Sequence, residues 1–125
     1  MSTNASIEQE IQTKGKTAPR VTPSDLAANI VGETYFTAAD GVLGAYKRHG
    51  DVYQGTDAHS PAYGLLTFCV LVLRNGFTVT GESACASPEN FDAEIGRKIA
   101  HENAVQKVWP LMGYELKCRL ARPAA

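Results

Sequence analysis

The dipeptide Asn75-Gly76, which stands between two apolar runs, constrains the fold of this chain more than any other feature. Asn-Gly is the strongest short-range signal for a β-hairpin, because both residues tolerate the positive φ angles of a two-residue type I′ turn. The run before it, Leu65–Leu73, is apolar almost throughout, as in a strand that is covered on both faces. We therefore predict an antiparallel hairpin that turns at Asn75-Gly76.

A two-residue turn also predicts which residues of the hairpin share a sheet face. It places Val72 opposite Val79. Because side chains alternate between the two faces, Phe77 and Val79 should lie on the face of Val70 and Val72. We expect a helix to cover this face. Either a side chain of that helix or a ligand fills the gap that Gly81 leaves in it, and the helix is favoured.

The segment after the second strand has the pattern of one long helix. Ser87 suits the N-cap, and Pro88 suits the first helical position, where its missing N–H costs nothing. Apolar residues recur at a spacing of four in two ridges: Phe91, Ile95 and Ile99, and then Ala100, Ala104, Val108 and Met112. Pro110 disfavours helical conformation in the residue before it, so we expect the helix to end near Trp109.

The flanking segments supply the remaining elements. Thr22 can cap a short helix that begins at Pro23 and stops at Gly32. Tyr114–Leu120 alternates apolar and polar residues, as in a third strand beside the hairpin, although Leu116 and Leu120 also fit one helical face. We predict an α+β fold: an antiparallel hairpin, extended to a three-stranded sheet, that is covered by one long helix and one short N-terminal helix.

The domain organisation follows from where this pattern stops. We predict a disordered polar tail over residues 1–21, a single α+β domain over residues 22–120 and a short tail over residues 121–125. Within the domain, residues 42–63 show no sustained period and contain several glycines, so we expect a long loop there.

Composition and motifs exclude several function classes. Twelve basic and thirteen acidic side chains give a net charge of −1, which makes a nucleic-acid binder an unfavoured interpretation. No apolar run approaches the roughly 20 residues of a membrane span, and the start of the chain lacks a signal-peptide pattern. The three cysteines form no Cys-x-x-Cys pair and are expected to be reduced thiols in a cytoplasm.

No catalytic or metal-binding motif is complete. His101-Glu102 resembles the start of a His-Glu-x-x-His zinc motif, but Val105 stands where the second histidine belongs. Four residues of the predicted loop could gather a divalent metal, but their spacing matches no ligand pattern: His49, Asp51, Asp57 and His59. We therefore predict a protein that is not an enzyme and that carries neither a metal nor a cofactor.

The sequence nevertheless allows one hypothesis for a ligand site, which would bind an anion or a nucleotide. The N–H groups at a helix start bind anions, and tyrosines with an arginine can stack on and neutralise a nucleotide. The residues that would form this site are Ser83, Ser87 and Asn90 around the helix start, with Tyr46, Arg48 and Tyr53 from the loop. Against it, Glu89 and Asp92 lie in the same first turn and would repel a phosphate.

The most specific block of the sequence runs Asn75-Gly-Phe-Thr-Val-Thr-Gly-Glu-Ser83 and continues with Pro88-Glu-Asn-Phe-Asp92. Together with the upstream segment Tyr35-Phe-Thr-Ala-Ala-Asp-Gly41, it resembles a family of small proteins encoded by tailed phages and prophages. The resemblance covers residues 22–120 apart from the predicted loop. It implies a phage-derived gene that acts in a bacterial cytoplasm, and it supplies no catalytic residues.

Two function hypotheses follow. The first is a non-enzymatic phage accessory protein that binds and modulates a bacterial host protein, for example one of defence or transcription. The alternative is a protein that binds and sequesters a small ligand or nucleotide. A homo-oligomer is also an option, because the predicted register leaves the Leu71/Leu73 face to be covered by the short helix or by a second copy.

Overall fold

The computed structural model describes residues 3–50 and 60–123, which fold into an α+β structure. The elements follow in the order α1 (Thr3–Thr13), α2 (Pro23–Asn29), β1 (Ile30–Thr37), α3 (Ala38–His49), the 3₁₀ turn η2 (Pro61–Leu65), β2 (Leu66–Leu73), β3 (Thr78–Ala84), the 3₁₀ turn η3 (Pro88–Asn90) and α4 (Ala93–Ala121). None of the helices in the described ranges is long and apolar enough to span a membrane.

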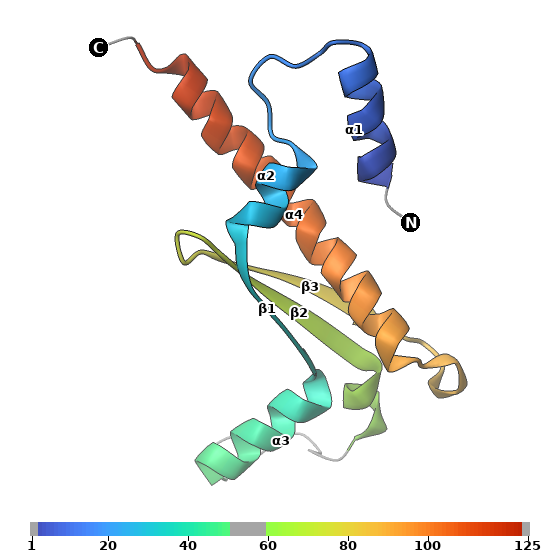
Figure 1. The fold of residues 1–125 in the computed structure, drawn as a ribbon. Coiled ribbons are helices and arrows are strands. Elements are labelled where there is room, and N and C mark those ends of the chain that lie inside the picture. The colour runs from blue at the N-terminus through green and yellow to red at the C-terminus, as the bar shows by residue number, and fades with distance from the viewer. Residues whose placement is uncertain (1–2, 51–59, 124–125) are drawn as a thin grey trace.

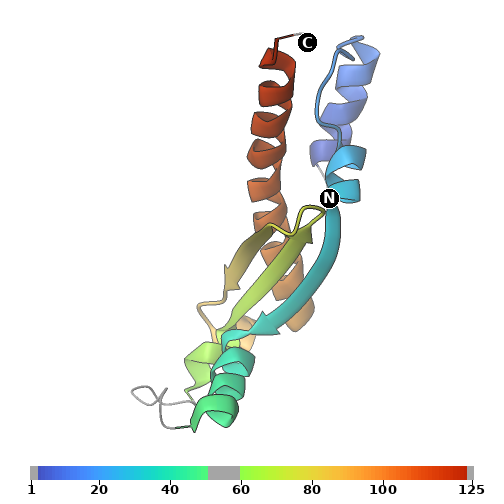
Figure 2. The same ribbon diagram turned by 90° about the vertical axis from the view of Figure 1, so that its left-hand side faces the viewer.

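The three strands form one antiparallel sheet in the order β1-β2-β3. The long helix α4 packs across β2 and β3 on one face of this sheet, as the two views in Figures 1 and 2 show. The predicted fold class, a three-stranded sheet covered by a long helix, is therefore confirmed. The third strand, however, is β1 and not the predicted strand over residues 114–120, which continue α4.

The hairpin lies where the Asn-Gly signal placed it, but its turn has three residues instead of two. The N–H of Gly76 donates to the carbonyl of Leu73 at 2.8 Å, and the N–H of Leu73 donates to Phe77 at 2.8 Å. Only Gly76 has a positive φ, of 90°, which is the pattern of a type I turn followed by a glycine bulge. The side chain of Asn75 supports this turn by accepting the N–H of Phe77 at 2.9 Å.

The extra turn residue shifts the predicted register by one position. Val79 pairs with Leu71, and Gly81 pairs with Cys69, so the predicted pairing of Val79 with Val72 is wrong. Since a one-residue shift moves every side chain of a strand to the other face, the helix covers the face of Leu71 and Leu73. This is the face for which the sequence interpretation expected either the short N-terminal helix or a second copy as cover.

The long helix also differs from the prediction at both ends. Asp92, not Ser87, is its N-cap, and residues 88–90 form the separate turn η3. The helix then continues through Pro110 to Ala121. The bias against helical conformation before a proline is a preference, and the lost hydrogen bond affects a single turn of a 29-residue helix.

A seam of small residues brings α4 and the sheet into direct contact. Gly96, Ala100, Ala104 and Val108 are all buried and recur at a spacing of four. A Cβ added to Gly81 would collide with the backbone of Ala100 and Ala104. The helix therefore fills the gap at Gly81, as expected, but with its backbone and not with a side chain. The first predicted ridge is wrong in part, because Ile95 and Ile99 remain 55% and 46% exposed.

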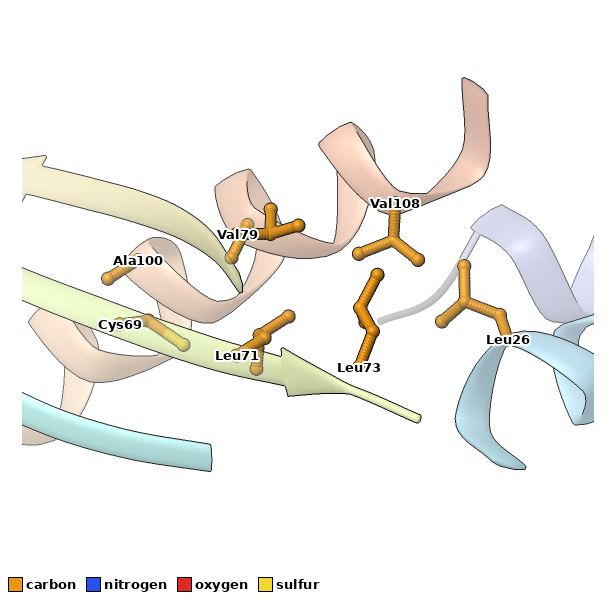
Figure 3. Packing of buried hydrophobic residues seen from close by; sticks show 8 residues of the cluster. Leu26, Cys69, Leu71, Leu73, Val79, Ala100 and Val108 are labelled. Atoms are coloured by element: carbon orange, nitrogen blue, oxygen red, sulfur yellow. The ribbon is translucent and has the colours of Figure 1, made fainter. Parts of the chain in front are cut away.

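The core extends from this seam towards α2. In Figure 3, Leu26 of α2 faces Leu73 of β2 and Val108 of α4, and all three are buried. The start of α2 is as predicted, since Thr22 caps it in a capping box with Asp25, but α2 ends at Asn29 and not at Gly32.

Two segments that lacked a predicted structure contain helices. Residues 42–49 of the predicted loop over residues 42–63 belong to α3, which begins with a second capping box, formed by Thr37 and Asp40. Residues 51–59 lie outside the described ranges. The predicted tail over residues 1–21 contains α1, which Arg20 joins through an ion pair with Glu8.

Candidate functional site

A groove of about 1030 Å³ lies between α2, the tip of the hairpin and the C-terminal half of α4. Its lining is mainly apolar and comes from segments that are far apart in the sequence. The apolar side chains are Val21, Leu73, Phe77, Leu111, Met112 and Leu116. Two of them are well exposed, Phe77 by 55% and Leu111 by 41%, so the groove presents apolar surface to solvent.

One wall of the groove is held in place by hydrogen bonds around Arg74. The N–H of Arg74 donates to the carbonyl of Asn29 at 2.9 Å and lies 3.2 Å from its side-chain oxygen. The guanidinium of Arg74 donates to the carbonyl of Ala28 at 2.9 Å. Because these residues end α2, the tip of the hairpin and α2 form one continuous surface.

The opposite wall exists because α4 does not end at Pro110. Figures 1 and 2 show that α4 extends well past the sheet on the side where α1 and α2 lie. This extension carries Leu111, Met112 and Leu116 into the groove. The sequence interpretation missed this wall because it ended the helix near Trp109, although the helical spacing of Met112 and Leu116 was a signal for it.

Three arginines surround the apolar lining, against two acidic side chains. The arginines are Arg20, Arg74 and Arg119, and the acids are Asp25 and Glu115. Arg119 donates to Glu115 at 2.7 Å. The main-chain hydrogen bond from Thr22 holds the pKa of Asp25 below its ordinary value. Both carboxylates therefore have partners. The lining has one more arginine than acid, and Arg20 is itself paired with Glu8 of α1.

Arg20 is the most tightly held of the three arginines. Its guanidinium donates two hydrogen bonds to the carboxylate of Glu8, at 2.5 and 2.7 Å. This hydrogen bonding is the main cause that lowers the pKa of Glu8 to about 2, and it raises the pKa of Arg20. The pair attaches α1 to the chain beside the groove.

One residue of the hypothetical ligand site at the helix start, Ser87, is already engaged with an acidic side chain of the protein. Ser87 donates to the carboxylate of Glu89 at 2.7 Å and makes no capping hydrogen bond. The carboxylate of Asp92 accepts the N–H of Ile95 at 3.0 Å at the true start of α4. Ser83, on β3, and Asn90, in η3, lie near this turn in the chain, but the start of α4 is capped without them.

The other half of that site comes from a different part of the molecule. Tyr46 and Arg48 lie in the last turn and a half of α3, which contacts β1, β2 and η2. Figure 1 shows that α3 extends away from the loop that carries Ser87. Tyr53 lies outside the described residues. The structure therefore does not bring the described members of the hypothetical site together.

A metal centre finds no support in the parts of the chain that can be described. Of the four residues considered from the sequence, His49 ends α3, whereas Asp51, Asp57 and His59 lie outside the described ranges. Within residues 3–50 and 60–123, no group of three or more His, Cys, Asp or Glu side chains is placed to hold a metal ion.

A second, polar hollow of about 570 Å³ lies between β1 and the outer side of α4. In it the hydroxyl of Tyr35 donates to Glu33 at 2.6 Å, and Nε2 of His101 lies 3.4 Å from the other oxygen of Glu33. Burial is the main cause that raises the pKa of Tyr35, and burial also raises the pKa of the neighbouring Cys69 thiol. A thiol that is fully buried and held protonated is a poor nucleophile.

A comparison with known protein families matches most of the chain. Residues 21–120 match the model of a family described as phage protein (N4 Gp49/phage Sf6 gene 66). No curated protein and no solved structure matches the chain. The matched range includes α2 to α4 and therefore both walls of the groove, whereas α1 lies outside it.

Proposed function

Because the chain belongs to the phage protein family of N4 Gp49 and phage Sf6 gene 66, we propose that it is a non-enzymatic accessory protein that binds and modulates a protein of the bacterial host. The observation that carries the proposal is the groove between α2, the hairpin tip and α4. Proteins of this size rarely leave a continuous apolar groove open unless a partner covers it.

The chemistry of the groove indicates what kind of partner segment it would accept. Exposed apolar side chains such as Phe77 and Leu111 provide a surface for apolar anchors, and the arginines at the rim provide charge. Arginines and aromatic residues are the side chains that most often dominate binding energy at interfaces. We therefore propose that an amphipathic segment of the host protein, with an apolar face and acidic flanks, lies in the groove.

The alternative hypothesis of a sequestered nucleotide has less support. Its described residues are divided between the end of α3 and the loop before α4. The apolar groove, in contrast, is assembled from segments that hydrogen bonds hold together. The proposed place of action is the bacterial cytoplasm, where a host factor of defence or transcription would be the target class.

The test is affinity capture from bacterial lysate, followed by titration of the purified captured protein. The decisive variant is Leu111→Glu, which places a charge in the groove, and the matched control is Gln106→Glu, which adds the same charge at an exposed position of α4 outside the groove. An interface anchor contributes about 2 kcal/mol or more, so we expect Leu111→Glu to weaken binding by about 30-fold.

The control should bind as the wild type does. Retention of full affinity by Leu111→Glu, with circular dichroism showing both variants folded, would place the partner elsewhere on the molecule. The complete absence of a stoichiometric partner across host lysates and salt concentrations would count against the proposed function itself.

A further inference from the structure

The outer edge of β1 carries main-chain groups that have no partner in the described structure. The hydrogen bonds from Leu73 to Phe77 and from Cys85 to Leu65 show that odd-numbered residues of β2 turn their main-chain groups towards β3. Even-numbered residues must then face β1, because the two directions alternate along an antiparallel strand. Gly32, Thr34 and Phe36 pair with these residues.

It follows that the intervening residues of β1, Glu33 and Tyr35, direct their N–H and carbonyl groups away from the sheet. Among residues 3–50 and 60–123, no other group pairs with them. The next outward N–H, that of Thr37, is already occupied because it donates to the carboxylate of Asp40 at 2.9 Å. The open part of the edge is therefore short and well defined, with two donors and two acceptors.

The opposite edge of the sheet is treated differently. Glu82 of β3 stands opposite Phe68 in a position where its carbonyl points away from β2. Asn103 of α4 donates to that carbonyl at 2.8 Å, and Lys107 lies 3.8 Å from the Glu82 carboxylate. Open strand edges favour pairing with other chains. On β3 the helix α4 covers the outward carbonyl of Glu82, whereas no element of the described structure lies on the outward groups of Glu33 and Tyr35 in β1.

The surface beside the open edge carries side chains of both charge types. The polar hollow between β1 and α4 is lined by Glu33, Glu94 and Glu102 with Arg97, Lys98 and His101, and within the chain Glu94 pairs with Lys98 and Glu33 lies near His101. The exposed Ile99 lies among them and continues a ridge from the exposed Ile95. A surface that combines side chains of both charge types with an exposed apolar ridge suits a second copy of itself across a two-fold axis.

We infer that β1 pairs antiparallel with β1 of a second copy, with the two-fold axis at Thr34, so that the two sheets join into one six-stranded sheet. This register places Glu33 opposite Tyr35 of the second copy, and each of the two pairs exchanges two main-chain hydrogen bonds. It uses only main-chain groups that are free, and it puts threonine opposite threonine, a favourable cross-strand pair.

The neighbouring symmetric registers are less suitable. An axis at Glu33 would set two carboxylates directly opposite each other, which is destabilising. An axis at Tyr35 would require the N–H of Thr37, which Asp40 already holds. The groove between α2 and α4 lies away from this edge, so the inference is independent of the proposed host-protein binding.

The experiment measures the mass of the full chain by sedimentation, with proline substitutions at matched positions of the two edges. Glu33→Pro removes an outward N–H from β1, and Thr80→Pro removes an outward N–H from β3, where proline is also tolerated at an edge. We expect wild type and Thr80→Pro to sediment at twice the 13.4 kDa of one chain, and Glu33→Pro to sediment as a monomer.

A second measurement does not depend on the folding of a proline variant. In a Cys118→Ser background, Thr34→Cys should form a disulfide-linked dimer under mild oxidation, because residues directly opposite in a non-hydrogen-bonded pair have their Cβ atoms about 5 Å apart. Thr80→Cys is the matched control and should remain monomeric on a non-reducing gel.

A wild-type chain that sediments as a monomer at all concentrations would overturn the inference. So would a dimer that persists in folded Glu33→Pro, or cross-linking of Thr34→Cys no faster than that of Thr80→Cys.

Discussion

Gly81 of β3 lies directly against the backbone of Ala104 in α4, so closely that a Cβ on the glycine would overlap the alanine nitrogen. Helix and sheet usually meet through interlocking side chains, but at this point the backbone of α4 contacts the backbone of β3 directly. This contact determines the position of α4 along the sheet, because no flexible side chain lies between the two elements.

Replacing Gly81 with alanine should therefore destabilise the protein by about 1 to 3 kcal/mol, the usual cost of overpacking. The helix backbone at Ala100 and Ala104 cannot move aside as a side chain could. The free energy of unfolding, measured in urea with fluorescence of the single tryptophan, Trp109, would show the loss.

The control for this change is Gly113→Ala. Gly113 lies within α4, and no heavy atom lies within 4 Å of the position that its Cβ would take. Alanine is favoured over glycine in a helix by about 1 kcal/mol, so the control should gain stability. Equal stabilities of Gly81→Ala and wild type would show that the close contact does not exist in solution.

Pro110 gives a second prediction, because it removes one hydrogen-bond donor from the interior of α4. An alanine there would donate to the carbonyl of Gln106, and alanine exceeds proline in helix preference by roughly 3 kcal/mol. We expect Pro110→Ala to raise the free energy of unfolding by up to about 3 kcal/mol. Urea denaturation measures the change, and Lys117→Ala, on the same exposed half of the helix, should leave it almost unchanged. A less stable Pro110→Ala would mean that the proline ring itself contributes packing.

The third prediction concerns the attachment of α1. The pKa of Glu8 is lowered to about 2 from the ordinary 4.5, chiefly by hydrogen bonding to Arg20. A lowered carboxyl pKa means that the stabilisation is complete above about pH 4.5 and is lost as the pH falls towards 2. Amide exchange in α1 should therefore accelerate over this interval, and an NMR titration of the Glu8 carboxyl carbon should give a midpoint near 2.

Arg20→Gln is the matched variant for the ion pair. It should return the Glu8 midpoint towards its ordinary value and loosen α1 already at neutral pH. If Glu8 of the wild type titrates near pH 4.5, the pair does not form in solution, and α1 is not attached through it.

The hairpin and the fold class were predictable from the sequence because they rest on local signals, the Asn-Gly dipeptide and the apolar runs around it. The register was not, since Asn75-Gly76 is compatible with both two-residue and three-residue turns. In the structure, the hydrogen bonds at Leu73 and the φ angles of the turn residues distinguish the two. A single extra residue in the turn then reversed the predicted faces of the sheet.

The candidate groove was less predictable, because it depends on the length of α4. The residue before a proline avoids helical conformation only on average, and the prediction applied this preference to end the helix near Trp109. Tertiary packing on both sides of Pro110, at Val108 and Met112, outweighs that preference in the structure. The helix α3 was missed for a related reason, since its glycines obscured a capping box at Thr37 and Asp40 that the sequence does contain.

Because α4 continues past Pro110, one part of this helix packs on the sheet and another part lines the groove. The part before Pro110 is confined by the backbone contact at Gly81, so most changes to its inner side disturb folding. The part beyond Pro110 projects from the sheet and contributes to the groove, where side chains such as Leu111 can change at small cost to stability. If the groove binds a host protein as proposed, substitutions at the end of this one helix would change its specificity without rebuilding the rest of the molecule.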